Sequence, residues 1–265
     1  MDAQRMNADL PDPALEPRCQ VIELRQYTLH PGRRDVLIEL FDRRFVETQE
    51  AVGISVIGQF RDVDAPDRFV WVRGFADMRA RTEALTAFYV EGTAWKRHRD
   101  AAVATMIDSD DVLLLRPVGS GAGLPPAGSA FPPAGSVRPA VGAGEPPASR
   151  VMVTIYHRDA PVDDHFAGFF RDRVAPLMAE TGARPLACFQ TEHAENTYPA
   201  LPVRTGENVF VWFASFADAA EQAEHERLLR GSGAWTEEVL PELSALLKCP
   251  PQHITLTPTA RSRLR

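Results

Sequence analysis

The stretch Phe69–Asp77, with the sequence Phe-Val-Trp-Val-Arg-Gly-Phe-Ala-Asp, returns as Phe210–Asp218, with the sequence Phe-Val-Trp-Phe-Ala-Ser-Phe-Ala-Asp. An Ala-Trp pair follows in both places and ends at Trp95 and at Trp235. Self-similarity on this scale predicts that the chain is built from two copies of one module.

Composition narrows the possible functions. The chain has 265 residues, of which 45% are hydrophobic, and a formal net charge of −7. A nucleic-acid partner is not expected, because neutralising phosphates needs clustered Lys and Arg, whereas here the basic residues are scattered among carboxylates. The three cysteines, Cys19, Cys188 and Cys249, contain no Cys-x-x-Cys pair. This argues against a disulfide framework or a zinc cluster and favours a reducing, cytoplasmic location.

No stretch approaches the roughly 18 consecutive apolar residues of a membrane span, so no membrane partner is expected. Changes in composition predict five segments along the chain. They are a loose N-terminal tail (1–18), a first domain (19–118), a linker rich in Pro, Gly and Ala (119–149), a second domain (150–259) and a basic C-terminal tail (260–265).

Each copy is predicted to follow the order β-α-β-β-α-β. The opening strands, Val21–Thr28 and Val151–His157, are rich in β-branched residues, and a hairpin follows in each copy. Asp77 and Asp218 stand where a helix N-cap is wanted. This order is the ferredoxin-like unit of the α+β class, an antiparallel sheet with helices on one face. We expect the two open sheet faces to pack against each other within the chain, as a half-closed barrel with a central cavity.

The first copy opens with Ile22–Gly32, which reads Ile-Glu-Leu-Arg-Gln-Tyr-Thr-Leu-His-Pro-Gly. This stretch is similar to the Glu-Leu-Arg-x-Tyr-x-Leu-x-Pro-Gly start of the NIPSNAP family of the dimeric α/β-barrel superfamily, and the Trp71 strand and Phe88–Trp95 add to the likeness. The resemblance covers nearly all of the first copy and is looser in the second. The resemblance implies the fold but no single activity. Relatives in the superfamily include cofactor-free monooxygenases of aromatic polyketides, isomerases, haem-binding enzymes and stress-response proteins.

The first strand carries the polar row that suggests chemistry. Alternation puts Glu23, Arg25 and Tyr27 on one face and apolar Ile22 and Leu24 on the other. If the apolar row packs against the helices, the polar row lines the barrel, where Arg25 would hold an anionic group and Tyr27 would donate a hydrogen bond. The alternative is a Glu23–Arg25 ion pair across a structural strand.

Alignment of the copies from Val21 and Val151 places Val153, Ile155 and His157 opposite Glu23, Arg25 and Tyr27. The cavity is therefore expected to have one polar and one apolar wall, with His157 at its rim. An unperturbed imidazole titrates near neutrality, so His157 is the predicted general base. The alternative is a strand-end histidine bonded to neighbouring backbone.

Several aromatic residues are candidates for contacting a ligand. His98 lies three residues after Trp95, so both can share a helical face, and Tyr89 is close in the sequence. The hairpin loop is longer in the second copy, and it carries His193, Asn196 and Tyr198 over the expected cavity mouth. The predicted substrate-binding set is Glu23, Trp71, Tyr89, Trp95, His98, Tyr198 and Trp212. The alternatives are ordinary packing of the aromatic residues and a tolerated surface insertion.

No Gly-x-Gly-x-x-Gly, Gly-x-Ser-x-Gly or His-Glu-x-x-His motif occurs, so dinucleotide binding, serine hydrolysis and zinc proteolysis lose their usual evidence. The leading hypothesis is an enzyme that acts on a small hydrophobic or aromatic metabolite without a cofactor or metal, by oxygenation, isomerisation or cyclisation. A non-catalytic binding or interaction protein is the alternative. Haem remains a further alternative, with His98, His157 or His225 as its axial ligand. Apart from this, His225 is given no role. The chain is expected to be a monomer or a homodimer.

Overall fold

The computed structural model describes residues 19–118, 131–133 and 136–265, so the predicted N-terminal tail and part of the predicted linker, 119–130 and 134–135, lie outside the described residues. The first half contains β1 (Val21–Leu29), α1 (Arg34–Arg44), α2 (Val46–Glu50), β2 (Ser55–Asp62), β3 (Arg68–Phe75), α3 (Met78–Leu85), the π-helix η2 (Thr86–Glu91), α4 (Thr93–Val103), β4 (Met106–Asp108) and β5 (Val112–Pro117). The second half contains β6 (Arg150–Arg158), α5 (Asp164–Phe169), the π-helix η4 (Phe170–Val174), α6 (Ala175–Glu180), β7 (Ala187–Thr191), β8 (Asn208–Phe216), α7 (Ala219–Gly231), the π-helix η5 (Ala234–Val239), α8 (Leu240–Ala245) and β9 (Gln252–Pro258).

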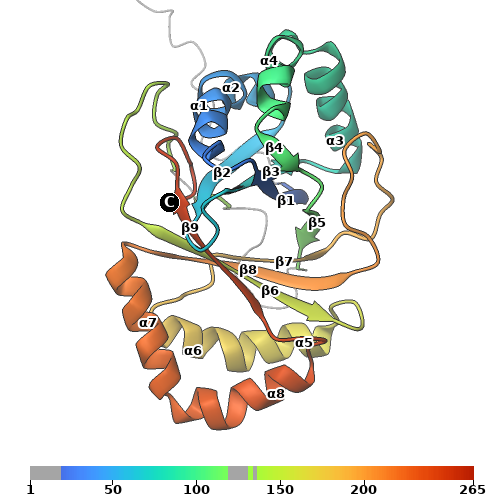
Figure 1. Cartoon of the computed structure of the whole chain (residues 1–265). Coiled ribbons are helices and arrows are strands. Elements are labelled where there is room, and N and C mark those ends of the chain that lie inside the picture. Colours follow the sequence, from blue (N-terminus) through green and yellow to red (C-terminus); the bar gives the residue numbers. More distant parts are fainter. Residues whose placement is uncertain (1–18, 119–130, 134–135) are drawn as a thin grey trace, which may run out of the picture.

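The strands form one closed antiparallel barrel. Within the described part of the chain, eight strands close a ring in the order β1-β3-β2-β9-β6-β8-β7-β5, and β5 pairs back to β1. The pairs β2–β9 and β5–β7 join the two halves. The helices α1–α4 lie on one side of the strands and α5–α8 on the other (Figure 1). The predicted α+β barrel is therefore confirmed.

Local sequence explains where the helices begin and change. The predicted caps are confirmed: the Asp77 carboxylate accepts a hydrogen bond from Ala80 N, and that of Asp218 accepts from Glu221 N. Ahead of Pro176, which has no amide hydrogen, α5 widens into the π-helical turns of η4 before α6 resumes.

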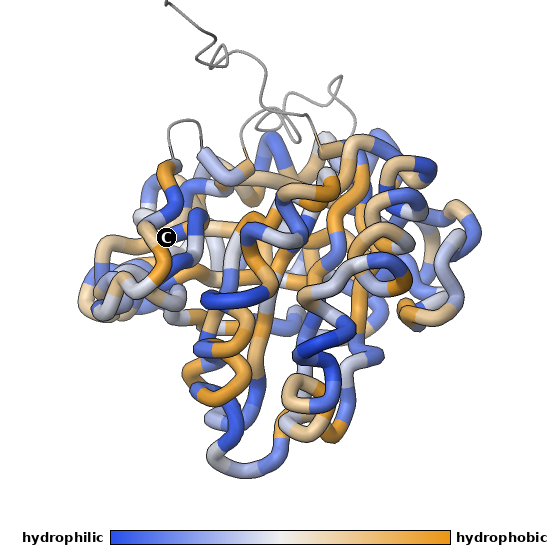
Figure 2. Tube along the Cα trace, turned by 90° about the horizontal axis from the view of Figure 1, so that it is seen from above, coloured by the Kyte–Doolittle hydropathy of each residue, from blue (hydrophilic) through white to orange (hydrophobic). Residues whose placement is uncertain are grey.

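The barrel interior is apolar on both sides. Ile22 and Leu24 of β1 belong to the same buried cluster as Val153 and Ile155 of β6. Figure 2 shows apolar stretches, in orange, along the strands in the middle of the molecule. The two open sheet faces thus bury each other, as expected from their sequences.

The predicted position of the polar row is wrong. Tyr27 belongs to the cluster between the first sheet and its helices, and Glu23 and Arg25 share its face of β1. Alternation separated the rows correctly but could not say which row faces the barrel. The apolar row turns inward because it meets the apolar row of the second half, whereas the charges find partners beneath α3.

The predicted alignment of the two opening strands is wrong by one residue. In the first half Tyr27 pairs with Phe69, and in the second half Tyr156 pairs with Phe210. Since Phe69 and Phe210 begin the repeated stretch, Tyr27 corresponds to Tyr156 and not to His157. A shift of one residue moves every side chain to the other face of a strand, so the expected pairing of a polar wall with an apolar one does not exist.

Segments outside the strands complete the core. Phe131, within the predicted linker, lies 4.8 Å from Phe213 and 5.3 Å from Phe189 between ring centroids. Leu264, within the predicted C-terminal tail, is 1% exposed in the same cluster. Both predicted connecting segments therefore contribute apolar side chains to the barrel.

We predict that Phe131→Ala lowers the free energy of unfolding by about 3–5 kcal/mol, because it removes a buried ring from a packed cluster. Val137→Ala, a change at a residue of the same segment that is 79% exposed, should change it by less than about 0.5 kcal/mol. Urea unfolding of both variants measures the difference. Equal midpoints would show that Phe131 is not part of the core.

Candidate functional site

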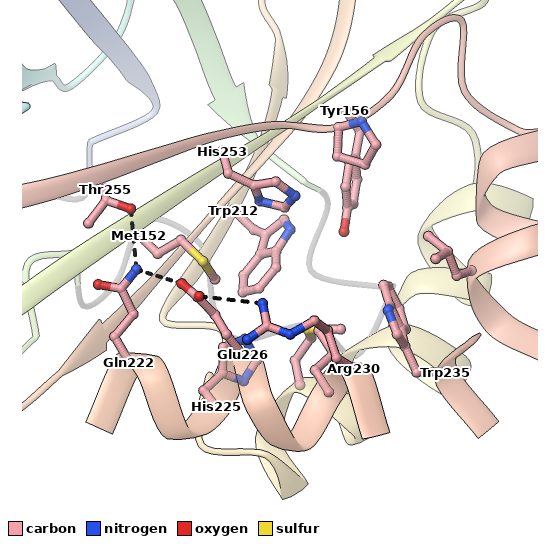
Figure 3. Close-up of a pocket in the computed structure, with 14 residues that line it drawn as sticks. Met152, Tyr156, Trp212, Gln222, His225, Glu226, Arg230, Trp235, His253 and Thr255 are labelled. Atoms are coloured by element: carbon pink, nitrogen blue, oxygen red, sulfur yellow. Dashed lines mark hydrogen bonds and ion pairs between the residues drawn. The ribbon is translucent and has the colours of Figure 1, made fainter. Parts of the chain in front are cut away.

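A candidate site lies between the second sheet and its helices. It is a cavity of about 390 Å³. Side chains of β6, β8 and β9 face it from the sheet, and those of α7 face it from the other side (Figure 3). Its lining residues include Met152, Tyr156, Met178, Trp212, Gln222, His225, Glu226, Arg230, Trp235, His253 and Thr255. A cavity of this size falls in the range that holds small-molecule ligands.

The deep wall of this cavity is aromatic and apolar. Tyr156 and Trp212 are 2% and 1% exposed, and Met152 and Met178 are also buried. Burial raises the pKa of the Tyr156 hydroxyl, and the neighbouring indole of Trp212 offsets only part of this effect. Tyr156 is therefore a protonated phenol, and the wall suits a flat, largely apolar molecule.

His225, on α7, supplies a buried imidazole with a defined tautomer. Its Nδ1 lies 2.9 Å from the Thr181 hydroxyl oxygen. That hydroxyl donates its own proton to the carbonyl oxygen of Leu177, at 2.8 Å, so it accepts from Nδ1–H of His225. Nε2 consequently carries the lone pair. Burial lowers the pKa of His225, which keeps the ring neutral and able to accept a proton.

His253, on β9, provides a second imidazole nearer the mouth of the cavity. Its Nδ1 lies 3.1 Å from the Thr154 hydroxyl oxygen of the adjacent strand. Burial lowers the pKa of His253, and the carboxylate of Glu226 opposes that shift. The residue is exposed on one side, so it can meet a ligand as it enters.

A polar chain crosses from the sheet to the opening. The Gln222 amide donates to the Thr255 hydroxyl at 3.2 Å and to the Glu226 carboxylate at 3.0 Å, and Arg230 pairs with Glu226 at 3.8 Å (Figure 3). Gln222 is buried, whereas Arg230 is exposed. The cavity therefore has an apolar end and a mouth that carries both charges.

The corresponding layer of the first half holds a buried ion cluster. The Glu23 carboxylate accepts from Arg25 Nη1 at 2.7 Å, from Arg73 Nε at 2.7 Å and from Arg81 Nε at 2.6 Å. All four side chains are at most 1% exposed. Burial alone would raise the pKa of Glu23, but the charges of Arg73, Arg25 and Arg81 outweigh it and hold that pKa far below its usual value. The predicted Glu23–Arg25 ion pair is confirmed as part of this cluster.

Several predicted site residues meet beside this cluster. Tyr27, Trp71, Tyr89 and Trp95 line one cavity of about 170 Å³. Tyr198 packs over Tyr89 with ring centroids 6.4 Å apart, so the longer hairpin loop of the second half does reach a cavity mouth, that of the first half. His98 lies outside the lining and contacts Phe45, with ring centroids 6.5 Å apart.

The three predicted catalytic residues do not come together. Arg25 Nε donates to the Tyr27 hydroxyl at 2.9 Å, but His157 lines neither cavity and lies 3.9 Å from the Glu207 carboxylate. Trp212 lines the second cavity, away from the other predicted aromatic residues. The predicted set is thus divided between the two halves.

His225 and His253 were not predicted as residues of a substrate site, and His225 was named only as a possible haem ligand. The repeat carries a signal for them: Phe210 follows Phe69 by 141 residues, and the same offset places His225 opposite Ala84 and His253 opposite Val112. A histidine in one half opposite an apolar residue in the other marks a local change of chemistry.

Residues 22–120 match the NIPSNAP family model. No curated protein matches the chain. The fold is similar to that of a putative monooxygenase of Lactobacillus acidophilus NCFM, with 12% sequence identity, a TM-score of 0.51 and coverage of 90% of this chain and 93% of that one. It is also similar to that of a putative monooxygenase of Fusobacterium nucleatum, with 9% sequence identity, a TM-score of 0.56 and coverage of 90% of this chain and 91% of that one. An anthrone oxidase-like protein is similar too, with 12% sequence identity, a TM-score of 0.52 and coverage of 92% of both chains. At these identities the likeness shows the fold alone.

Among the described residues, no helix is long and apolar enough to cross a membrane. The same part of the chain contains no group of three or more His, Cys, Asp or Glu side chains placed to hold a metal ion.

We predict that Glu23→Gln lowers the free energy of unfolding at pH 7 by about 3–5 kcal/mol, because three buried guanidinium groups lose their carboxylate. The folded pKa of Glu23 is depressed, so its contribution is present above the unfolded value of about 4.5 and is lost as pH falls. The difference in free energy of unfolding between wild type and Glu23→Gln should therefore narrow below about pH 4.5. Urea unfolding at pH 3.5 to 7 measures it.

Glu39→Gln is the matched control for this prediction, since the Glu39 side chain is 68% exposed and makes a surface pair with Arg43. That change should cost less than about 1 kcal/mol. If Glu23→Gln behaved like Glu39→Gln, the cluster would not stabilise the first half.

Proposed function

We propose that the protein is an enzyme that acts on a small hydrophobic or aromatic molecule, and that its active site is the cavity of the second half. The observation that carries this proposal is the neutral imidazole of His225, which is buried beside an aromatic wall in a cavity of about 390 Å³. A buried base with a lowered pKa in a well-formed cavity is a usual mark of a catalytic site.

The lining suggests how a substrate would lie. Its flat body would pack between Trp212, Trp235 and Tyr156, and its polar edge would point towards His253 and Arg230 at the mouth. Such a ligand is amphipathic and aromatic, for example a hydroxylated arene or its keto form. The thioethers of the wall adapt to differences in ring shape.

The proposed first step is removal of a proton. His225 Nε2 would accept it from an acidic C–H or O–H of the substrate, and the positive charge of Arg230 would stabilise the enolate or phenolate that forms. The substrate anion would then reduce O2 by two electron pairs. One oxygen atom becomes the carbonyl oxygen of the former methylene group, and the other is released as water. Return of the proton at another carbon would be an isomerisation. Oxygenation is our leading proposal, and the anthrone oxidase-like protein with the same fold makes anthrone a reasonable probe.

Two alternatives have supporting observations. The barrel interior is filled largely by apolar side chains, as expected of a non-catalytic binding protein. The second alternative is haem, for which His225 or His253 would be the axial ligand and Arg230 would pair with a propionate. Bound there, haem would supply redox chemistry. The predicted roles of Arg25, Tyr27 and His157 in catalysis stay untested.

We predict that native mass spectrometry of the purified protein gives the mass of the bare polypeptide, and that its visible spectrum shows no Soret band. A mass excess equal to haem together with a Soret band would replace the cofactor-free proposal with the haem alternative.

We predict that His225→Ala reduces turnover of anthrone at least about 100-fold, because it removes the general base. Oxygen uptake and product absorbance measure turnover. His165→Ala, on an exposed part of α5, should leave turnover unchanged. In the wild type, activity requires the neutral ring, so its loss at low pH should have a midpoint below about 6.5, the ordinary histidine pKa.

The outcomes separate the hypotheses. Turnover without oxygen uptake would replace oxygenation with isomerisation. Binding of the aromatic probe without turnover would favour the binding protein. Full activity of His225→Ala would refute the assignment of the base.

A further inference from the structure

The ion cluster of the first half carries more positive than negative charge. Three guanidinium groups, those of Arg25, Arg73 and Arg81, surround the single carboxylate of Glu23. Within the described residues, no other carboxylate lies within 4.0 Å of these three groups, and their further partners are neutral. Two positive charges therefore remain buried without a counter-ion, an arrangement that is costly in a protein interior.

The fold itself does not need this charge. The register of the strands places Met152, Thr154 and Ala214 of the second half opposite Glu23, Arg25 and Arg73. None of these three residues is charged, yet the second half forms the same sheet and helix layer. The charged cluster is thus a feature of the first half alone, which favours a role in binding.

Hydrogen-bond donors without acceptors belong to residues at or beside the neighbouring cavity. The Tyr27 hydroxyl accepts from Arg25, and the Tyr89 hydroxyl accepts from Arg73 Nη1 at 3.3 Å, so each keeps its own proton to donate. In the described residues, Trp71 Nε1 and Arg73 Nη2 are buried and have no hydrogen-bond partner. Tyr27, Tyr89 and Trp71 all line the cavity of about 170 Å³.

The rest of this cavity is an aromatic and apolar enclosure. Phe45, Phe88 and Trp95 form much of its wall, and Leu201 closes it from the longer hairpin loop of the second half. That loop is tied to the cluster, since Arg81 Nη1 donates to the Asn196 side chain at 3.0 Å. The enclosure is small, so it suits one ring with one polar substituent.

We infer that the cavity of the first half binds a small aromatic carboxylate, whose ring packs in the enclosure and whose anionic group accepts hydrogen bonds from Tyr27, Tyr89 and Trp71. The bound anion also offsets the excess charge of the arginines behind these residues. This site is separate from the proposed active site, and its existence does not depend on that proposal.

Isothermal titration calorimetry with benzoate and with the neutral isostere benzamide tests the inference on the full-length protein. Benzoate should bind at least about tenfold more tightly than benzamide, because hydrogen bonds to a charged group contribute more than those to a neutral one. Tyr89→Phe and Trp71→Phe each remove one donor and keep an aromatic ring, so each should weaken benzoate about tenfold.

Two further variants complete the test. Leu201→Phe fills the cavity and should abolish benzoate binding, whereas Val90→Ala, at an exposed residue next to Tyr89, should leave the affinity unchanged. Equal affinity for benzoate and benzamide would overturn the charge argument. Undiminished benzoate binding by Leu201→Phe would place the anion elsewhere, and no benzoate binding by the wild type would overturn the inference altogether.

Discussion

The structure depends on one constraint: in a closed antiparallel barrel, each strand gives one row of side chains to the interior and the next row to the helices outside. The interior rows of the two halves face each other, as Leu24 and Val153 do, and they must be apolar to pack. Charged groups in the middle of a strand, such as Glu23, Arg25 and Arg73, then lie in the layer between sheet and helices. Both candidate sites lie in such layers.

The two layers differ because of a few substitutions at matching positions. Arg73 in the first half corresponds to Ala214 in the second, and Arg81 corresponds to Gln222. Shorter, neutral side chains leave more open space in the second layer, with a cavity of about 390 Å³ against about 170 Å³ in the first. One scaffold therefore presents two chemistries: a neutral cavity with imidazoles and a smaller cavity with excess positive charge.

The sequence predicted the architecture well because local signals and repetition agree. The hairpins and the caps at Asp77 and Asp218 follow from residue types at fixed spacing. The facing of the Glu23 row could not be predicted, since alternation is the same whichever side is inside. The apolar rows that decide that facing meet only when the two halves close the barrel, and the partners Arg73 and Arg81 lie 50 and 58 residues along the chain from Glu23. His225 and His253 likewise meet only across α7 and β9.

We propose that small aromatic molecules bind between sheet and helices of the second half and not inside the barrel. The chain has four tryptophans, of which Trp212 and Trp235 line the second cavity and Trp71 and Trp95 line the first. Fluorine-19 NMR of protein labelled with fluorotryptophan, titrated with 1-naphthol, reports on both layers at once. We expect the resonances of Trp212 and Trp235 to shift on binding and those of Trp71 and Trp95 to stay in place. Binding of 1-naphthol with no change at Trp212 and Trp235 would contradict this proposal.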